Sequence, residues 1–191
     1  MTTRQAIYTI IIIEILIGIL GVINYGYHLD ALQATTRFSG RFSLFLFSLI
    51  FLFHGSRKFE IKNVISEKYF FIFALAHGIH LMELLTYIYF SGNELIPLRL
   101  VGGFIAYLLI FLMPLILEWH EQGRIKSQNY IRITWVYLFY VWFVFFMSYL
   151  PRVQGKLPNV GGNYWEFVVL LTWVSLMMGI KLQQLITSRT N

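Results

Sequence analysis

The stretch AIYTIIIIEILIGILGVINY, residues 6–25, is long and apolar enough to cross a lipid bilayer as a helix. About 20 such residues in a helix cover roughly 30 Å, the thickness of the hydrocarbon core. Five further apolar stretches follow, at residues 42–58, 69–90, 98–117, 131–150 and 164–182. The second is the shortest. Its apolar part ends near His54, and the span reaches Lys58 only if the basic side chains at its end extend to the membrane surface. The sequence predicts an all-α protein, a six-helix transmembrane bundle forming a single domain over residues 1–191.

The composition supports this prediction and excludes several other classes of protein. Hydrophobic residues make up 58% of the chain and charged residues 13%, against roughly 45–50% and 25% in soluble proteins. The absence of cysteine excludes thiol catalysis and thiolate metal sites. The net charge of +6 comes from basic residues that lie between the apolar runs, so we expect no nucleic-acid partner. A lipid bilayer is the expected environment.

The basic residues also predict how the chain is oriented in its membrane. Ten of the 15 fall at the two termini and in the second and fourth connections, and five in the first, third and fifth. Because cytoplasmic segments carry the excess of Lys and Arg, both termini are predicted to be cytoplasmic.

Among the ionisable side chains of the predicted spans, five are candidates for a role at membrane depth: Glu14, His54, His77, His80 and Glu83. Such residues usually face the bundle interior and have a partner. The three in the third span are three residues apart, which predicts one polar stripe on that helix. Glu14 and His77 both lie about 12 Å from the inner boundary at a rise of 1.5 Å per residue. A Glu14–His77 pair is therefore expected if the first and third helices are neighbours.

The stripe is compatible with several roles, which the residues alone leave open. The histidines would form hydrogen bonds between helices in a non-catalytic membrane partner or assembly subunit. Imidazole and carboxylate groups also suit zinc or iron, with His77 as the metal ligand. A proton or ion pathway would use Glu14 and Glu83.

Three segments carry a further signal: Ser39-Gly40-Arg41, Phe73-Ala74-Leu75-Ala76-His77, and residues 102–114 with Gly102-Gly103-Phe104 and Pro114. With six spans and cytoplasmic ends, they resemble the ferric-reductase-like transmembrane superfamily over residues 36–150. That superfamily includes the NADPH oxidase membrane domains and the haem-binding membrane subunit of the bacterial methionine sulfoxide reductase system. The resemblance implies haem b in the cytoplasmic half, held by axial histidines from the third and fifth spans.

His77 matches the third-span ligand by position, but the fifth span contains no histidine. Tyr140 lies nearly level with His77 and is the alternative axial ligand that this span offers. His80 and His54 are the other candidates for contact with the cofactor. Arg57 and Lys58 are the expected partners of the haem propionates at the inner leaflet.

The resemblance implies an integral membrane redox protein, an electron-transfer subunit of the inner (plasma) membrane of a bacterium. The sequence has no P-loop, dinucleotide-binding fingerprint, His-Glu-x-x-His or Gly-x-Ser-x-Gly motif. We therefore assign no catalytic residue and leave open whether the protein is an enzyme. Electrons would come from a cytoplasmic reductase or another membrane subunit, and would leave toward a quinone or an external acceptor.

Overall fold

The computed structural model describes residues 3–54, 68–92, 97–157 and 161–190. This part of the chain forms six helices: α1 (Thr3–Tyr25), α2 (Leu29–Phe53), α3 (Lys68–Ser91), α4 (Pro97–Glu121), α5 (Ser127–Val153) and α6 (Tyr164–Thr190). The described residues include no strand, and all six helices are long and apolar enough to cross a membrane. The predicted all-α, six-helix fold is confirmed.

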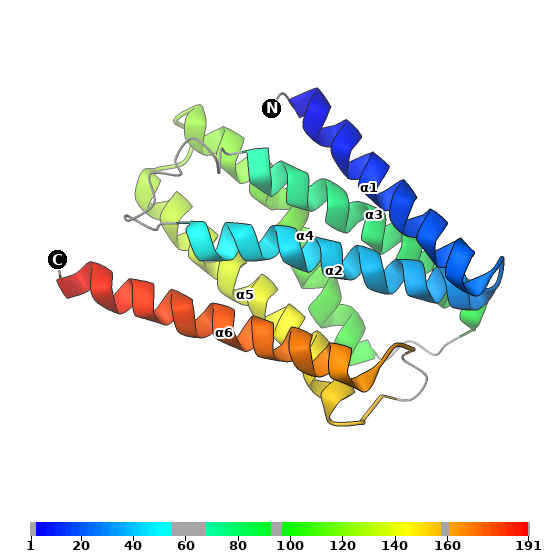
Figure 1. Ribbon diagram of the computed structural model, residues 1–191. Helices are drawn as coiled ribbons and strands as arrows, with labels where there is room; N and C mark the ends of the chain where they lie inside the picture. Colours follow the sequence, from blue (N-terminus) through cyan, green and yellow to red (C-terminus); the bar gives the residue numbers. More distant parts are fainter. Residues whose placement is uncertain (1–2, 55–67, 93–96, 158–160, 191) are drawn as a thin grey trace.

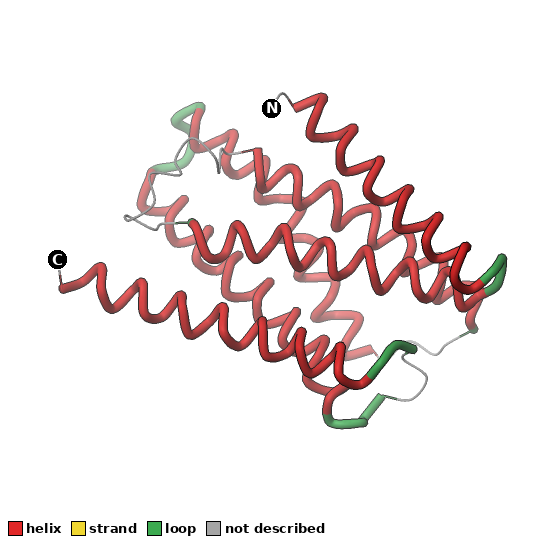
Figure 2. Tube along the Cα trace, in the orientation of Figure 1, coloured by secondary structure: helices red, strands yellow, loops and turns green. Residues whose placement is uncertain are grey.

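Helix α2 lies in the middle of the bundle, where it contacts α1, α3, α5 and α6. Helix α3 also packs against α1 and α4, and α5 packs between α4 and α6. Consecutive helices run in opposite directions, so the two chain ends lie at the same end of the bundle (Figures 1 and 2). Which side of the membrane this end faces stays a prediction from the charges.

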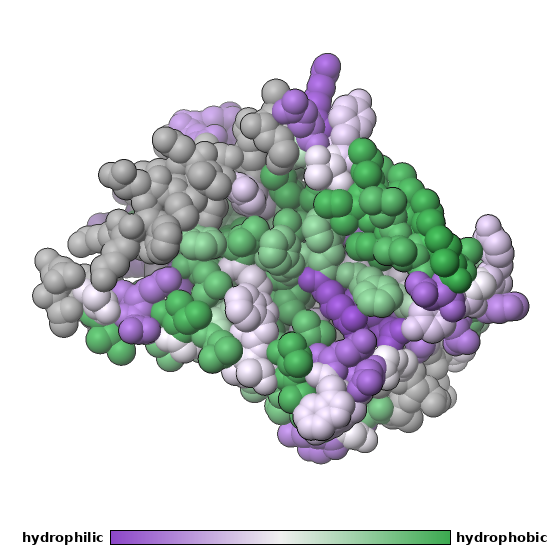
Figure 3. Space-filling model, in the orientation of Figure 1, coloured by the Kyte–Doolittle hydropathy of each residue, from purple (hydrophilic) through white to green (hydrophobic). Residues whose placement is uncertain are grey.

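Aromatic side chains form the centre of the bundle. The ring of Phe47 on α2 lies 5.6 Å from that of Phe51, 5.6 Å from Phe73 on α3 and 5.4 Å from Phe145 on α5. The outer face of α1 is also hydrophobic, since large side chains such as Ile12 and Ile23 are exposed. This face appears as a continuous hydrophobic area in Figure 3. Lipid is the solvent in which such a surface is stable.

Helix α2 begins at Leu29, well before the predicted start of the second span at Phe42. The prediction was wrong here because a hydropathy run stops at polar residues, and the first half of α2 contains several. Thr35, Thr36 and Ser39 are nevertheless buried in the bundle. Because this helix packs against four others, it can carry polar side chains at membrane depth.

Two adjacent glycines in a membrane span, such as Gly102 and Gly103, usually allow another helix to pack closely. The structure shows close packing at a different glycine. A Cβ atom on Gly102 or Gly103 would have no described neighbour within 4 Å. At Gly21 of α1, in contrast, a Cβ atom would overlap Oγ1 of Thr35 and lie 3.1 Å from the carbonyl oxygen of Ala31. Gly21 therefore lets α1 approach the backbone of α2 closely.

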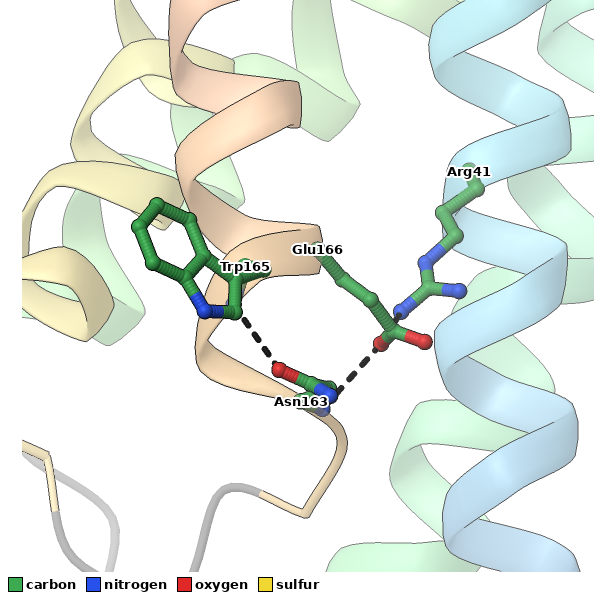
Figure 4. Close-up of polar contacts among 4 residues, drawn as sticks. All are labelled: Arg41, Asn163, Trp165 and Glu166. Atoms are coloured by element: carbon green, nitrogen blue, oxygen red, sulfur yellow. Dashed lines mark hydrogen bonds and ion pairs between the residues drawn. The ribbon is translucent and has the colours of Figure 1, made fainter.

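Helix α6 begins with a capping box formed by Asn163 and Glu166 (Figure 4). The side-chain oxygen of Asn163 accepts a hydrogen bond from the backbone N–H of Trp165 at 3.0 Å. In return, the Asn163 backbone N–H donates to Oε2 of Glu166 at 3.3 Å. Such reciprocal bonds satisfy donors that a helix start leaves unpaired. They also hold the Glu166 carboxylate beside α2.

Candidate functional site

A partly open cavity of about 250 Å³ lies among the helices, lined by residues of α2, α3, α4 and α5 and by Phe167 of α6. His77 and His80 line one part of it, which we call the histidine end. Arg37, Arg41 and Arg152 line another part, which we call the arginine end. Apolar side chains form much of the remaining wall, including those of Ala106, Ile110, Val141 and Val144. The cavity thus combines imidazole and guanidinium groups with an apolar wall.

The ring of His77 is held between aromatic neighbours. It stacks on Phe73 at 5.2 Å and on Tyr107 of α4 at 4.8 Å, and the edge contact with Phe145 of α5 is 5.8 Å. The residue is 9% exposed, and its Nδ1 atom has no hydrogen-bond partner among the described residues. These contacts fix the ring orientation at the wall of the cavity.

The ring of His80 lies beside that of His77, with 5.3 Å between the two centroids. Its other side faces Gly40 of α2, where a Cβ atom would lie 3.0 Å from Cε1 of the ring. The absence of a side chain at Gly40 therefore makes room for His80. The prediction that these two histidines face the bundle interior together is consistent with this placement.

The arginine end brings together side chains that sequence reasoning assigned to membrane-surface loops. Arg37 and Arg41 are one turn apart on α2, so they lie on one face of that helix. Arg152 belongs to α5 and donates to the carbonyl oxygen of Ser148. Nη2 of Arg41 lies 2.6 Å from Oε2 of Glu166 (Figure 4). The four-residue spacing of Arg37 and Arg41 was the signal that would have placed them on a helix.

Glu14 and Glu83 form a second polar group, in which α1, α2 and α3 meet. The two carboxyl groups lie near each other and near the hydroxyl of Ser39 on α2. Glu14 is 5% exposed and Ser39 is fully buried. Both carboxyl oxygens of Glu14, Oε2 of Glu83 and Oγ of Ser39 have no hydrogen-bond partner in the described part of the chain.

The expected Glu14–His77 pair does not form among the described contacts. Glu14 faces Glu83 and Ser39, whereas the aromatic rings of Phe73 and Tyr107 cover the two faces of His77. The two residues lie at a similar depth in the membrane, which is compatible with a pair. The rotation of α1 and α3 about their axes nevertheless directs the two side chains to different neighbours.

The remaining predicted cofactor contacts lie elsewhere. His54 is the C-terminal cap of α2, where its carbonyl oxygen accepts a hydrogen bond from Nζ of the buried Lys181 at 2.5 Å. The hydroxyl of Tyr140 donates to the carbonyl oxygen of Gly102 at 3.2 Å. Neither residue belongs to the cavity wall that the structure describes. Arg57 and Lys58 lie outside the described residues.

The described residues do not form a metal centre made of protein side chains alone. They contain no group of three or more His, Asp or Glu side chains arranged to hold an ion.

Comparisons with models of known protein families, with curated proteins and with solved structures find no match to this chain. The resemblance to the ferric-reductase-like superfamily therefore remains a prediction from the residues that carry it.

Proposed function

We propose that this protein is an integral membrane redox protein that binds haem b through His77. The supporting observation is that His77 and His80 both line the cavity among the helices. A neutral imidazole with a fixed ring orientation is a common axial ligand of haem iron. Phe73 and Tyr107 provide that orientation by stacking on His77. Haem, when bound, would supply one-electron oxidation and reduction.

In this proposal His77 would hold haem without a second histidine from α5, because α5 contains none. The α5 residues in the wall near His77 include Val141, Val144 and Phe145, none of which ligates iron. Tyr140, the expected ligand from α5, is hydrogen-bonded to Gly102 instead. The ferric-reductase-like pattern of two axial histidines is therefore incomplete here, as the sequence indicates.

Binding haem also requires the cavity to widen. Its volume of about 250 Å³ lies below the roughly 300–1,000 Å³ of pockets that hold drug-sized ligands. Tyr107 and Phe145 line the cavity next to His77, so their rings are the ones that have to move. The electron donor would be a cytoplasmic reductase or another membrane subunit, and the acceptor a quinone or an external molecule. The membrane would be the inner (plasma) membrane of a bacterium.

An absorption spectrum tests this function directly. We expect the protein purified from haem-replete cells to show a Soret band that shifts when dithionite is added. The band should disappear in His77→Ala and in His77→Phe, the second of which keeps the aromatic stacking. His120→Ala is the matched control, because His120 stacks on Tyr130 and does not line the cavity. A stable, colourless wild-type protein would refute haem binding.

A second candidate function, a proton or ion pathway, is favoured by the nearness of the Glu14 and Glu83 carboxyl groups. Buried carboxyl groups without hydrogen-bond partners are typical of such pathways in membrane proteins. We expect Glu14→Gln to abolish proton flux into liposomes that contain the purified protein. Glu118→Gln is the control, because Glu118 is exposed near the end of α4. Flux that is absent from the wild type, or equal in Glu14→Gln, excludes this role for Glu14.

If the protein is colourless and carries no flux, the proposal that remains is a non-catalytic membrane partner or assembly subunit. In that case the polar side chains of α1, α2 and α3 would serve contacts between helices.

A further inference from the structure

The arginine end of the cavity brings three guanidinium groups to one part of the wall. Arg37, Arg41 and Arg152 all reach the cavity wall, and no Asp or Glu is among the described residues that line it. One carboxylate, that of Glu166, lies beside this end and forms its ion pair with Arg41. Among the described residues, Glu166 is thus the carboxylate that lies beside the guanidinium groups of Arg41 and Arg37.

Among the three arginines, Arg37 has buried side-chain donors without an acceptor in the described part of the chain. Its Nε and Nη1 atoms are buried and have no hydrogen-bond partner within the described ranges. The backbone at Gly162 lies against the same guanidinium, since a Cβ atom there would overlap Nη1. Buried N–H donors without an acceptor are costly in a protein. An acceptor that enters the cavity would satisfy them.

Guanidinium groups recognise phosphate and carboxylate with particular strength, because paired N–H donors match two oxygens of these anions. We propose that the arginine end is a binding site for an oxyanion group, a phosphate or a carboxylate, with Arg37 as its principal donor. The apolar wall formed by Ile110, Val141 and Val144 then suits a small hydrophobic part of the same ligand.

This inference rests on the cavity of the proposed function and adds to it the place where the phosphate or carboxylate groups of a ligand bind. It does not require haem, because the arginines are present whether or not His77 ligates iron. The oxyanion would belong to a soluble molecule or to an anionic lipid headgroup that enters from the membrane surface.

Inorganic phosphate is the probe that tests the site. The assay is equilibrium dialysis of radiolabelled phosphate against the purified protein in phosphatidylcholine nanodiscs, with His77→Phe in all samples so that haem does not compete. We expect saturable binding that Arg37→Gln weakens tenfold or more. Arg124→Gln is the matched control and should bind as before, because Arg124 is exposed in the α4–α5 connection.

The lysine variant keeps the test valid if Arg37→Gln does not fold. Arg37→Lys retains the charge but loses the paired donors, so it should bind phosphate more weakly than the arginine form. A second arm uses nanodiscs that contain phosphatidic acid. Displacement of phosphate in this arm identifies a lipid headgroup as the ligand, and undiminished binding identifies a soluble anion.

The site is refuted if phosphate shows no saturable binding in phosphatidylcholine nanodiscs, or if binding is equal in the Arg37 and Arg124 variants. Failure of this inference is separate from failure of the proposed function. The Soret band reports on wild-type His77, whereas dialysis reports on Arg37 in protein that lacks the His77 imidazole.

Discussion

Replacing Gly21 by alanine should loosen α1 from the rest of the bundle, and Gly18→Ala on the same helix should not. At Gly21 the new methyl group would overlap Oγ1 of Thr35 and lie 3.1 Å from the carbonyl oxygen of Ala31, whereas at Gly18 it would have no described neighbour within 4 Å. Overpacking of this kind costs about 1–3 kcal/mol.

The pair of variants isolates this cost. Both replace glycine by alanine inside α1, so both gain the same helix propensity, about 1 kcal/mol. The difference between their free energies of unfolding is therefore the steric cost alone. A difference of 1–3 kcal/mol corresponds to roughly a 5- to 150-fold change in the unfolding equilibrium constant.

Reversible unfolding by sodium dodecyl sulfate in mixed micelles, followed by near-ultraviolet circular dichroism, measures this difference. A double-mutant cycle with Thr35→Ala adds a second check, because removing Oγ1 should recover part of the stability lost in Gly21→Ala. The remaining loss would come from the Ala31 carbonyl group. Equal stabilities of the Gly18 and Gly21 variants would refute the close approach of α1 to α2.

Two further predictions concern other contacts. Lys181→Met removes the hydrogen bond to the His54 carbonyl oxygen at 2.5 Å. The free energy of unfolding should fall by about 1.5–3 kcal/mol, the usual range for a hydrogen bond to a charged group. An unchanged unfolding curve would show that this bond contributes no net stability. Gly40→Ala should destabilise the protein by about 1–3 kcal/mol, because the new methyl group would lie 3.0 Å from the His80 ring. Gly103→Ala is the control and should not have this cost, because its methyl group would have no described neighbour within 4 Å. Thermal unfolding of the two glycine variants decides this point, and equal midpoints would contradict the placement of His80.

The polar stripe of the third span shows how far spacing alone predicts a site. A helix turns by about 100° per residue, so the step of six positions from His77 to Glu83 brings them about 120° apart around the axis. The structure accordingly places the His77 ring against the cavity and directs Glu83 toward Ser39 and Glu14. The neighbouring pairs in the stripe share a face, but its two ends do not.

The sequence by itself determined that the chain forms six helices suited to lipid, because hydropathy is a local property that each apolar run expresses alone. It also placed His77, His80, Glu14 and Glu83 at membrane depth. The tertiary structure decided which of these side chains meet, since that depends on the order and rotation of the helices. It also extended α2 back to Leu29, because burial against four helices, rather than local hydropathy, keeps the polar first half of α2 inside the bundle.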